Sequence, residues 1–112
     1  MKVITLCGSL KFMDDMMAVS ELLSIEGYCV LTPIYHVLDC VKIEEDMLEK
    51  LKLAHLKRIE LSDAIFVLDI DNYIGSSTKL EIEYALKLGK EIIYYSKNKK
   101  YWKEGSTYEE KA

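Results

Sequence analysis

The sequence contains few helix-breaking residues, few cysteines and no long hydrophobic run. Its 112 residues include one proline and five glycines. The three cysteines are an odd number without zinc-site spacing, so we predict neither a disulfide framework nor a metal site. The longest apolar run, residues 64–68, is far shorter than the roughly 20 residues of a membrane helix. The net charge of −4 argues against binding to nucleic acid or to an anionic membrane.

Half of the residues are hydrophobic and 30% are charged, which excludes a wholly disordered chain. A chain of this length has enough buried surface for one core and no second domain. The first residues faintly resemble a signal peptide, but Lys11 and Asp14 follow without a small-residue cleavage site. With Cys7 and Cys29 in strand-like stretches, we predict a reduced, cytoplasmic protein without a structural disulfide.

Short β-branched runs alternate with longer stretches of helical spacing. The predicted strands are residues 2–7, 28–32, 64–69 and 91–95. The predicted helices lie between Ser9 and Gly27 and over residues 43–61 and 78–88, the second with a predicted inner face of Met47, Leu48, Leu51, Ala54 and Ile59. This alternation predicts right-handed crossovers and a parallel sheet. We therefore expect an α/β, flavodoxin-like (Rossmann-like) three-layer sandwich of about four strands in the order 2-1-3-4.

The last stretch of the chain differs in composition from the rest. Residues 97–112 contain no Leu, Ile or Val and are half charged. We predict a domain over residues 1–96, followed by either a solvated tail or an arm that packs on a partner chain. Three aromatic residues in this stretch, Tyr101, Trp102 and Tyr108, keep the second interpretation open. Met13, Met16 and Met17 are predicted to fill the core, with an exposed interface as the alternative.

The topology predicts where a ligand would bind. Open parallel sheets bind ligands beyond the carboxyl ends of their strands, where the strand order reverses. Two loops meet there, residues 8–11 and 69–78, and each leads into a helix N-terminus that suits a phosphate or carboxylate. Neither loop is a P-loop or a Rossmann glycine fingerprint. The predicted binding residues are Gly8, Ser9, Lys11, Asp71, Tyr73, Gly75, Ser76 and Ser77.

Three titratable residues are candidates for chemistry at this site. Glu81 lies early in the third helix, where Thr78-x-x-Glu81 also reads as a capping box. Asp69 ends a strand and is either a ligand contact or a turn cap. His55 is alone on its helix, where a histidine is more often structural. The residue pattern leaves these alternatives open.

Several of these segments together resemble the nucleoside 2-deoxyribosyltransferase family. The resemblance covers about residues 1–95 and rests on Cys7-Gly8-Ser9, on His55 with residues 62–68, and on residues 73–85, which contain Glu81-Ile82-Glu83-Tyr84-Ala85. The opening is particularly similar to the branch that hydrolyses 2′-deoxynucleoside 5′-monophosphates. The last run also resembles short bacterial and phage relatives.

The resemblance implies a chemistry. A helix-three glutamate, matched by Glu81, attacks C1′ of the sugar and expels the base, and water or a second base completes hydrolysis or transfer. The family commonly has an aspartate where this chain has His55, which is able to protonate a leaving base near neutral pH. Serines 76 and 77 near the expected phosphate position favour a nucleotide over a nucleoside.

The sequence thus predicts an N-glycosidase acting on a nucleoside 5′-monophosphate, with Glu81, His55 and Asp69 as catalytic residues. The alternatives are a base-exchanging transferase and a nucleotide-binding module without chemistry, since this fold class hosts both enzymes and binding proteins. We expect no cofactor, and a small-molecule nucleotide or nucleoside as partner. The resemblance also implies a homo-oligomer.

Overall fold

The computed structural model describes residues 1–37 and 42–102 and contains the predicted alternation of strands and helices. Its main elements are β1 (Val3–Cys7), α1 (Met13–Ile25), β2 (Cys29–Leu31), α2 (Glu45–Leu61), β3 (Ala64–Val67), α3 (Ser76–Lys87) and β4 (Glu91–Tyr94). Short 3-10 turns lie at Leu10–Phe12, Ile70–Asn72, Tyr95–Lys97 and Lys99–Tyr101. No helix in these two described stretches is both long enough and apolar enough to cross a membrane.

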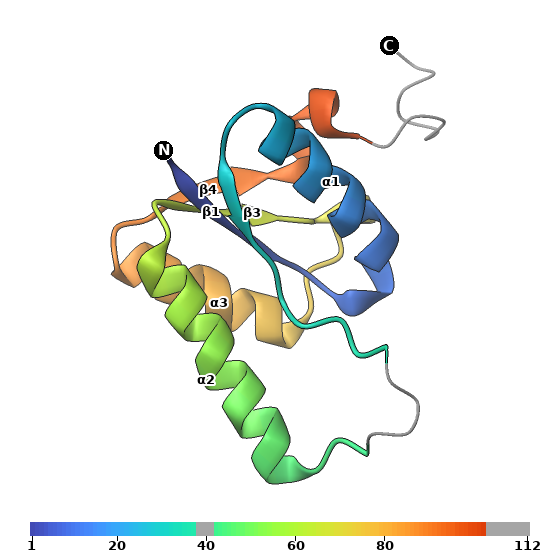
Figure 1. Cartoon of the computed structure of the whole chain (residues 1–112), viewed down its shortest axis with the longest axis vertical. Coiled ribbons are helices and arrows are strands. Elements are labelled where there is room, and N and C mark those ends of the chain that lie inside the picture. Colours follow the sequence, from blue (N-terminus) through green and yellow to red (C-terminus); the bar gives the residue numbers. More distant parts are fainter. Residues whose placement is uncertain (38–41, 103–112) are drawn as a thin grey trace.

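The four strands form one parallel sheet in the order β2-β1-β3-β4, which confirms the predicted topology. Helix α1 covers one face, and α2 and α3 cover the other (Figure 1). The strand order reverses between β1 and β3, where Ile4 pairs with Ala64 and Cys7 with Val67. The carboxyl ends of β1 and β3 therefore lie side by side, as a ligand site in an open α/β sheet requires.

The alternation of side chains along β1 divides them between the two faces. Ile4 and Leu6 belong to the core cluster that contains Met16, Val19 and Leu23 of α1. Cys7 belongs to the opposite cluster, with Ile59 of α2 and Ala85 of α3. Since the side-chain period of a strand is two, Thr5 shares the face of Cys7. Thr5 and Cys7 of β1 thus face α2 and α3.

The carboxyl end of α2 is held against β1 by buried hydroxyl groups. Thr5 Oγ1 and Ser62 Oγ both donate to the carbonyl oxygen of Arg58, at 3.1 and 2.8 Å. The two hydroxyls also contact each other. These bonds satisfy polar groups that would otherwise be costly to bury. They fix the turn of α2 that carries His55 and Arg58.

The predicted inner face of α2 is largely wrong. Met47, Leu48 and Leu51 are 39%, 56% and 37% exposed, and Ala54 is also exposed. Only His55 and Ile59 of this helix are buried. The physical reason is position, because the N-terminal half of α2 extends beyond the sheet (Figure 1). These apolar side chains line a pocket or lie on the surface instead of the core.

The methionines of α1 are divided between core and surface. Met16 is completely buried, as predicted for a core residue. Met17 is 53% exposed, so the prediction that it fills the core is wrong. Side chains of consecutive helical residues point about 100° apart, so Met17 points away from the sheet when Met16 points toward it.

The expected homo-oligomer stays a prediction.

The fold continues past the predicted domain boundary at residue 96. Tyr101 is 5% exposed and packs edge-on against Phe66 of β3, with ring centroids 5.4 Å apart. Its hydroxyl donates to Glu26 Oε1 at 2.6 Å. Trp102 stacks on Tyr95 and donates its indole N–H to the Tyr95 carbonyl oxygen. The domain therefore extends at least to Trp102. The segment after residue 96 has no Leu, Ile or Val, and its aromatic side chains are the groups that pack against the core.

The remainder of the predicted tail, residues 103–112, lies outside the described residues. The same is true of residues 38–41, part of the loop between β2 and α2.

Candidate functional site

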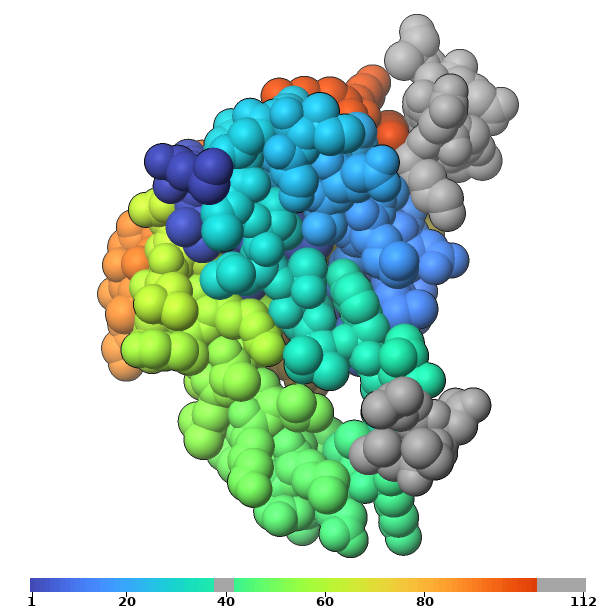
Figure 2. Space-filling view, viewed as in Figure 1, coloured from blue at the N-terminus to red at the C-terminus, as the bar shows by residue number. Residues whose placement is uncertain are grey.

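A pocket of about 450 Å³ opens at the carboxyl end of β1, between α2, α3 and the segment that follows β2. It is within the size range of small-molecule sites. In Figure 2 the surface is hollowed between that teal segment and the green α2. The lining residues are Gly8, Leu10, Pro33, Ile34, Leu48, Leu51, Lys52, His55, Leu56, Arg58, Ser77, Leu80 and Glu81.

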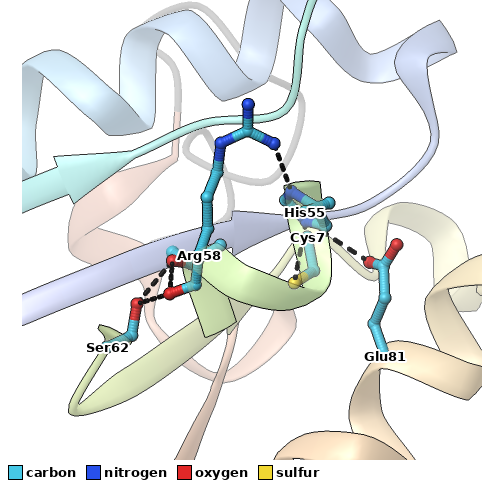
Figure 3. Close-up of polar contacts among 6 residues, drawn as sticks. Cys7, His55, Arg58, Ser62 and Glu81 are labelled. Carbon is cyan, nitrogen blue, oxygen red and sulfur yellow. Dashed lines mark hydrogen bonds and ion pairs between the residues drawn. The ribbon is translucent and has the colours of Figure 1, made fainter. Parts of the chain in front are cut away.

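Three side chains from three different elements converge beside this pocket. His55 Nε2 lies 3.6 Å from Cys7 Sγ and 3.7 Å from Glu81 Oε1. Cys7 comes from the end of β1, His55 from α2 and Glu81 from α3 (Figure 3). The side chains of His55 and Glu81 are only 9% and 20% exposed. We call these three residues the Cys7–His55–Glu81 cluster.

The capping-box interpretation of Glu81 is wrong. Helix α3 begins at Ser76 with Gly75 as its N-cap, so Thr78 lies inside the helix and is buried. A capping box requires the first residue of the motif at the N-cap position. Glu81 is instead in the second turn of α3, on the side that faces His55. Its side chain is therefore available for another role.

Arg58 determines which nitrogen of His55 carries the proton. Arg58 Nη1 lies 3.3 Å from His55 Nδ1. A guanidinium group only donates hydrogen bonds, so Nδ1 accepts, and the proton of a neutral imidazole is on Nε2. Burial, with the nearby Arg58 charge second, lowers the pKa of His55 to about 4. At neutral pH the ring is thus uncharged, and its Nε2 atom lies 3.6 Å from Cys7 Sγ and 3.7 Å from Glu81 Oε1.

Burial acts on the two other members of the cluster in the opposite direction. It raises the pKa of Glu81 to about 7, although a hydrogen bond with Cys7 partly offsets the effect. Burial also raises the pKa of the Cys7 thiol, with the Glu81 charge as a second cause. His55 and Glu81 therefore do not form a salt bridge at neutral pH. Such perturbed titratable groups beside a pocket are typical of functional sites.

The raised pKa of Glu81 predicts a pH-dependent stability. The folded protein disfavours the carboxylate, so stability is lost as pH rises through about 7. In a Glu81→Gln variant this loss disappears. At about pH 8.5 its free energy of unfolding should exceed that of the parent by on the order of 3 kcal/mol. The difference should vanish below about pH 4.5, where Glu81 is protonated in both states.

Urea denaturation across this pH range measures the effect. A chelator is present so that metal ions do not bind to Glu81. The contribution of His55 to the free energy of unfolding changes with pH in the opposite direction. Its lowered pKa adds stability above pH 6.5, and this stability is lost as pH falls toward 4. The Glu81→Gln variant should therefore become more stable as pH rises over that interval. A difference between variant and parent that does not change with pH would contradict the assigned environment of Glu81.

The cluster also has the composition of a metal site. Its ligand atoms, Cys7 Sγ, a His55 ring nitrogen and a Glu81 oxygen, all lie within 4.8 Å of one another. Thiolate, imidazole and carboxylate are all zinc ligands. Ligand spacing along the sequence gave no sign of this site, because the three residues are far apart in the chain.

The predicted binding residues are only partly brought together. Gly8 and Ser77 line the pocket with His55 and Glu81. At Gly8 a side chain would be crowded, because a Cβ atom would lie 3.1 Å from Met16 Cε and 3.2 Å from Leu68 Cβ, and these neighbours would have to move by a few tenths of an ångström. Ser76 is exposed at the start of α3 and is not among the lining residues.

Ser9, Lys11, Tyr73 and Gly75 form a separate local arrangement. Ser9 Oγ accepts from the backbone N–H of Lys11 and caps the turn that precedes α1. Lys11 Nζ lies over the Tyr73 ring, 3.6 Å from its centroid. A Cβ atom at Gly75 would lie 3.4 Å from the Tyr73 hydroxyl. None of these four residues is among those that line the pocket.

Asp69 and Asp71 lie at a second, smaller pocket of about 240 Å³, which shares no residue with the first. Asp69 accepts hydrogen bonds from the backbone N–H and the hydroxyl of Ser96, at 2.9 and 2.6 Å. These bonds hold the turn after β4. Asp71 has a left-handed backbone with φ of 55°. The structure thus engages the Asp69 carboxylate with Ser96 and not with its own turn, and does not bring it to Glu81. Because Asp69 lines this second pocket, a role in ligand contact stays a prediction.

Sequence reasoning missed Cys7, Arg58 and Lys52. A cysteine in a strand ordinarily packs as a small hydrophobe, but the strand alternation from Thr5 places Cys7 on the α2 face. Arg58 and Lys52 each lie three residues from His55, a spacing that places side chains on one side of a helix. That spacing was the available signal for both cations.

The fold and the site together define an α/β protein with a pocket of about 450 Å³ at the carboxyl end of a parallel sheet. Comparison of the sequence with protein-family models and with curated proteins gives no match. The resemblance to nucleoside 2-deoxyribosyltransferases therefore stays a prediction.

Proposed function

We propose that the protein is an N-glycosidase that cleaves the base–sugar bond of a nucleoside 5′-monophosphate, with Glu81 as the nucleophile. The observation that carries this proposal is the position of Glu81. Its carboxyl group borders a pocket of about 450 Å³, is mostly buried, and lies 3.7 Å from His55 Nε2. A carboxylate that faces a partly enclosed pocket is the nucleophile of the carboxyl pair that retaining glycoside cleavage uses.

The charges around the pocket favour an anionic substrate. Lys52 and Arg58 line it from α2, whereas Glu81 is its one acidic lining residue in the described stretches. Ser77 lines it from the first turn of α3, where the helix presents N–H groups and the positive end of its dipole. A 5′-phosphate fits these groups better than a free 5′-hydroxyl. The apolar side chains of Leu48, Leu51 and other lining residues suit the base.

The reaction follows from these groups. The ionised Glu81 oxygen forms a bond to C1′ as the bond from C1′ to the base nitrogen breaks. The base leaves with the electron pair and takes a proton from solvent water, and the attacking water of the next step returns a proton to solvent. Water then attacks C1′ of the glycosyl ester, which releases the sugar phosphate and restores the carboxylate. Because His55 is uncharged at neutral pH, it fits a role as an Nε2–H donor that orients Glu81 better than the expected role as a cationic acid.

A base-release assay tests this function. Purified, chelator-treated protein is incubated with ribo- and 2′-deoxynucleoside 5′-monophosphates and with the matching nucleosides, and products are separated by chromatography. We expect free base and sugar phosphate from at least one monophosphate, and slower release from the matching nucleoside. Release that is faster from the nucleoside would contradict the phosphate assignment. No base from any compound would contradict the glycosidase.

One observation favours a second candidate, a nucleotide-binding module without chemistry. The lowered pKa of His55 leaves the expected acid uncharged at neutral pH. Such a module should be stabilised by a nucleotide without forming product. A ligand at 100 times its dissociation constant adds about 2.7 kcal/mol to the free energy of unfolding. Acceleration of base release by an added free base would instead identify the transferase.

A further inference from the structure

The Cys7–His55–Glu81 cluster has a geometric property that glycoside cleavage does not require. Cys7 Sγ and Glu81 Oε1 approach the same ring nitrogen of His55, at 3.6 and 3.7 Å. In a catalytic triad the two partners of a histidine contact opposite nitrogens. Here Nδ1 is taken by Arg58, and the sulfur, nitrogen and oxygen ligand atoms all lie within 4.8 Å of one another. Figure 3 shows Cys7 and Glu81 both linked to His55.

We propose that Cys7, His55 and Glu81 bind a zinc ion at this point. The spacing matches a tetrahedral ion. Zinc bonds of about 2.3 Å to sulfur and about 2.0–2.1 Å to nitrogen and oxygen place S and N about 3.6 Å apart, and N and O about 3.4 Å apart. The observed S–N and N–O distances are 3.6 and 3.7 Å. The sulfur and the Glu81 oxygen lie within 4.8 Å of each other, and binding would bring them to the roughly 3.6 Å of a tetrahedral ion.

The donor set and the setting are those of a zinc site with one open position. One thiolate, one imidazole and one carboxylate make three protein ligands, which leaves the fourth position for water or another small ligand. His55 and Glu81 both line the pocket, so the fourth position is reachable from it. Mixed sulfur, nitrogen and oxygen ligands in a tetrahedral arrangement favour zinc over magnesium or calcium.

Binding requires a defined set of proton movements. The Cys7 thiol proton, and any proton on Glu81, leave to water. The His55 proton leaves Nε2, and Nδ1 takes one up, so that the Nε2 lone pair faces the ion. Arg58, which donates to Nδ1, must then turn away. Its side chain is partly exposed and has room to do so. Arg58 is therefore the residue that limits the affinity.

This inference goes beyond the proposed function, because zinc would occupy the Glu81 oxygen that attacks C1′. The zinc-bound protein should then release no base, whereas the chelated protein should be active. Metal binding itself does not depend on the glycosidase being correct. Spectroscopic binding data therefore distinguish a failure of this inference from a failure of the proposed function.

Cobalt(II), a spectroscopic substitute for zinc, provides the test. The parent protein is the Cys29→Ser, Cys40→Ser double variant, in which Cys7 is the sole thiol. We expect saturable binding, a sulfur-to-cobalt charge-transfer band, visible bands of a four-coordinate ion, and displacement by zinc. In this parent, Cys7→Ser and Glu81→Gln should each weaken cobalt binding at least about 100-fold. Loss of an outer-shell contact costs up to about 100-fold in metal affinity, and loss of a direct ligand should cost no less.

A matched histidine control and a variant of Arg58 complete the design. His36→Gln, which changes the other histidine, should leave the affinity unchanged. Arg58→Gln should tighten binding by about 10-fold, because an amide oxygen is able to accept from Nδ1–H and a positive charge is removed. Circular dichroism checks that each variant is folded. Absence of the charge-transfer band, or equal affinity after Glu81→Gln, would overturn the inference.

Discussion

Glu81→Gln should lower the rate of base release by about 10³-fold or more, because a neutral amide cannot form the glycosyl ester. Glutamine has nearly the volume of glutamate, so the packing against His55 and Cys7 is preserved. The burial that raises the pKa of Glu81 to about 7 makes the neutral side chain easier to accommodate than the carboxylate. The variant should therefore be folded but inactive. Chromatographic detection of free base over a long incubation measures the loss.

Glu83→Gln is the matched control for this experiment. Glu83 lies two residues further along α3, is exposed, and is not among the residues that line the pocket. It removes the same charge from the same helix, so its activity should stay close to that of the parent. Equal losses in the two variants would point to a general effect of charge on α3. Substantial turnover by Glu81→Gln would rule out Glu81 as the nucleophile.

Tyr101→Ala should lower the free energy of unfolding by about 3–5 kcal/mol, the cost of removing a buried aromatic ring. Tyr101 is almost completely buried and contacts Phe66, which is fully buried in β3. Its hydroxyl also bonds to Glu26 at the end of α1. A domain of this size has a total stability of about 5–15 kcal/mol, so this loss is a large fraction of it. Urea denaturation monitored by circular dichroism measures the change.

Tyr101→Phe separates the ring from its hydroxyl. This variant keeps the edge-on contact with Phe66 and loses only the hydrogen bond to Glu26, so it should cost about 0.5–1.5 kcal/mol. The comparison decides whether the fold ends at residue 96 or continues to Trp102. If Tyr101→Ala were as stable as the parent, the residues after β4 would be an appendage and not part of the core.

The sheet was predictable because its signals are local. Each β-branched run was long enough for one strand, and each helical stretch long enough for one crossover, so the right-handed rule left few alternative strand orders. Gly27 and Gly89 both have positive φ, at 98° and 74°, at the ends of α1 and α3 where helix stops were predicted. The place of the pocket followed from the same topology, since β1 and β3 meet where the order reverses.

The faces of individual helices were less predictable. Apolar spacing placed Met47, Leu48 and Leu51 on the inner face of α2, yet they lie beyond the sheet. Periodicity shows which side of a helix is apolar, but the length of helix that the sheet covers depends on where the strands end. The Thr78 capping box failed for a related reason. The pattern was present, but Gly75 at the N-cap moved the start of α3 by two residues.

By itself, the sequence determined the parallel four-strand sheet, its order and the edge at which Gly8, Ser77 and Glu81 lie, because hydrophobic periodicity and chain connectivity act locally. His55 was placed there only by the family resemblance. Only the tertiary structure decided that Cys7 and Arg58 join His55, that Asp69 bonds to Ser96 instead, and that Tyr101 belongs to the core. It also set the pKa values of His55 and Glu81. Those properties depend on burial and on distances between residues far apart in the chain, which no local pattern encodes.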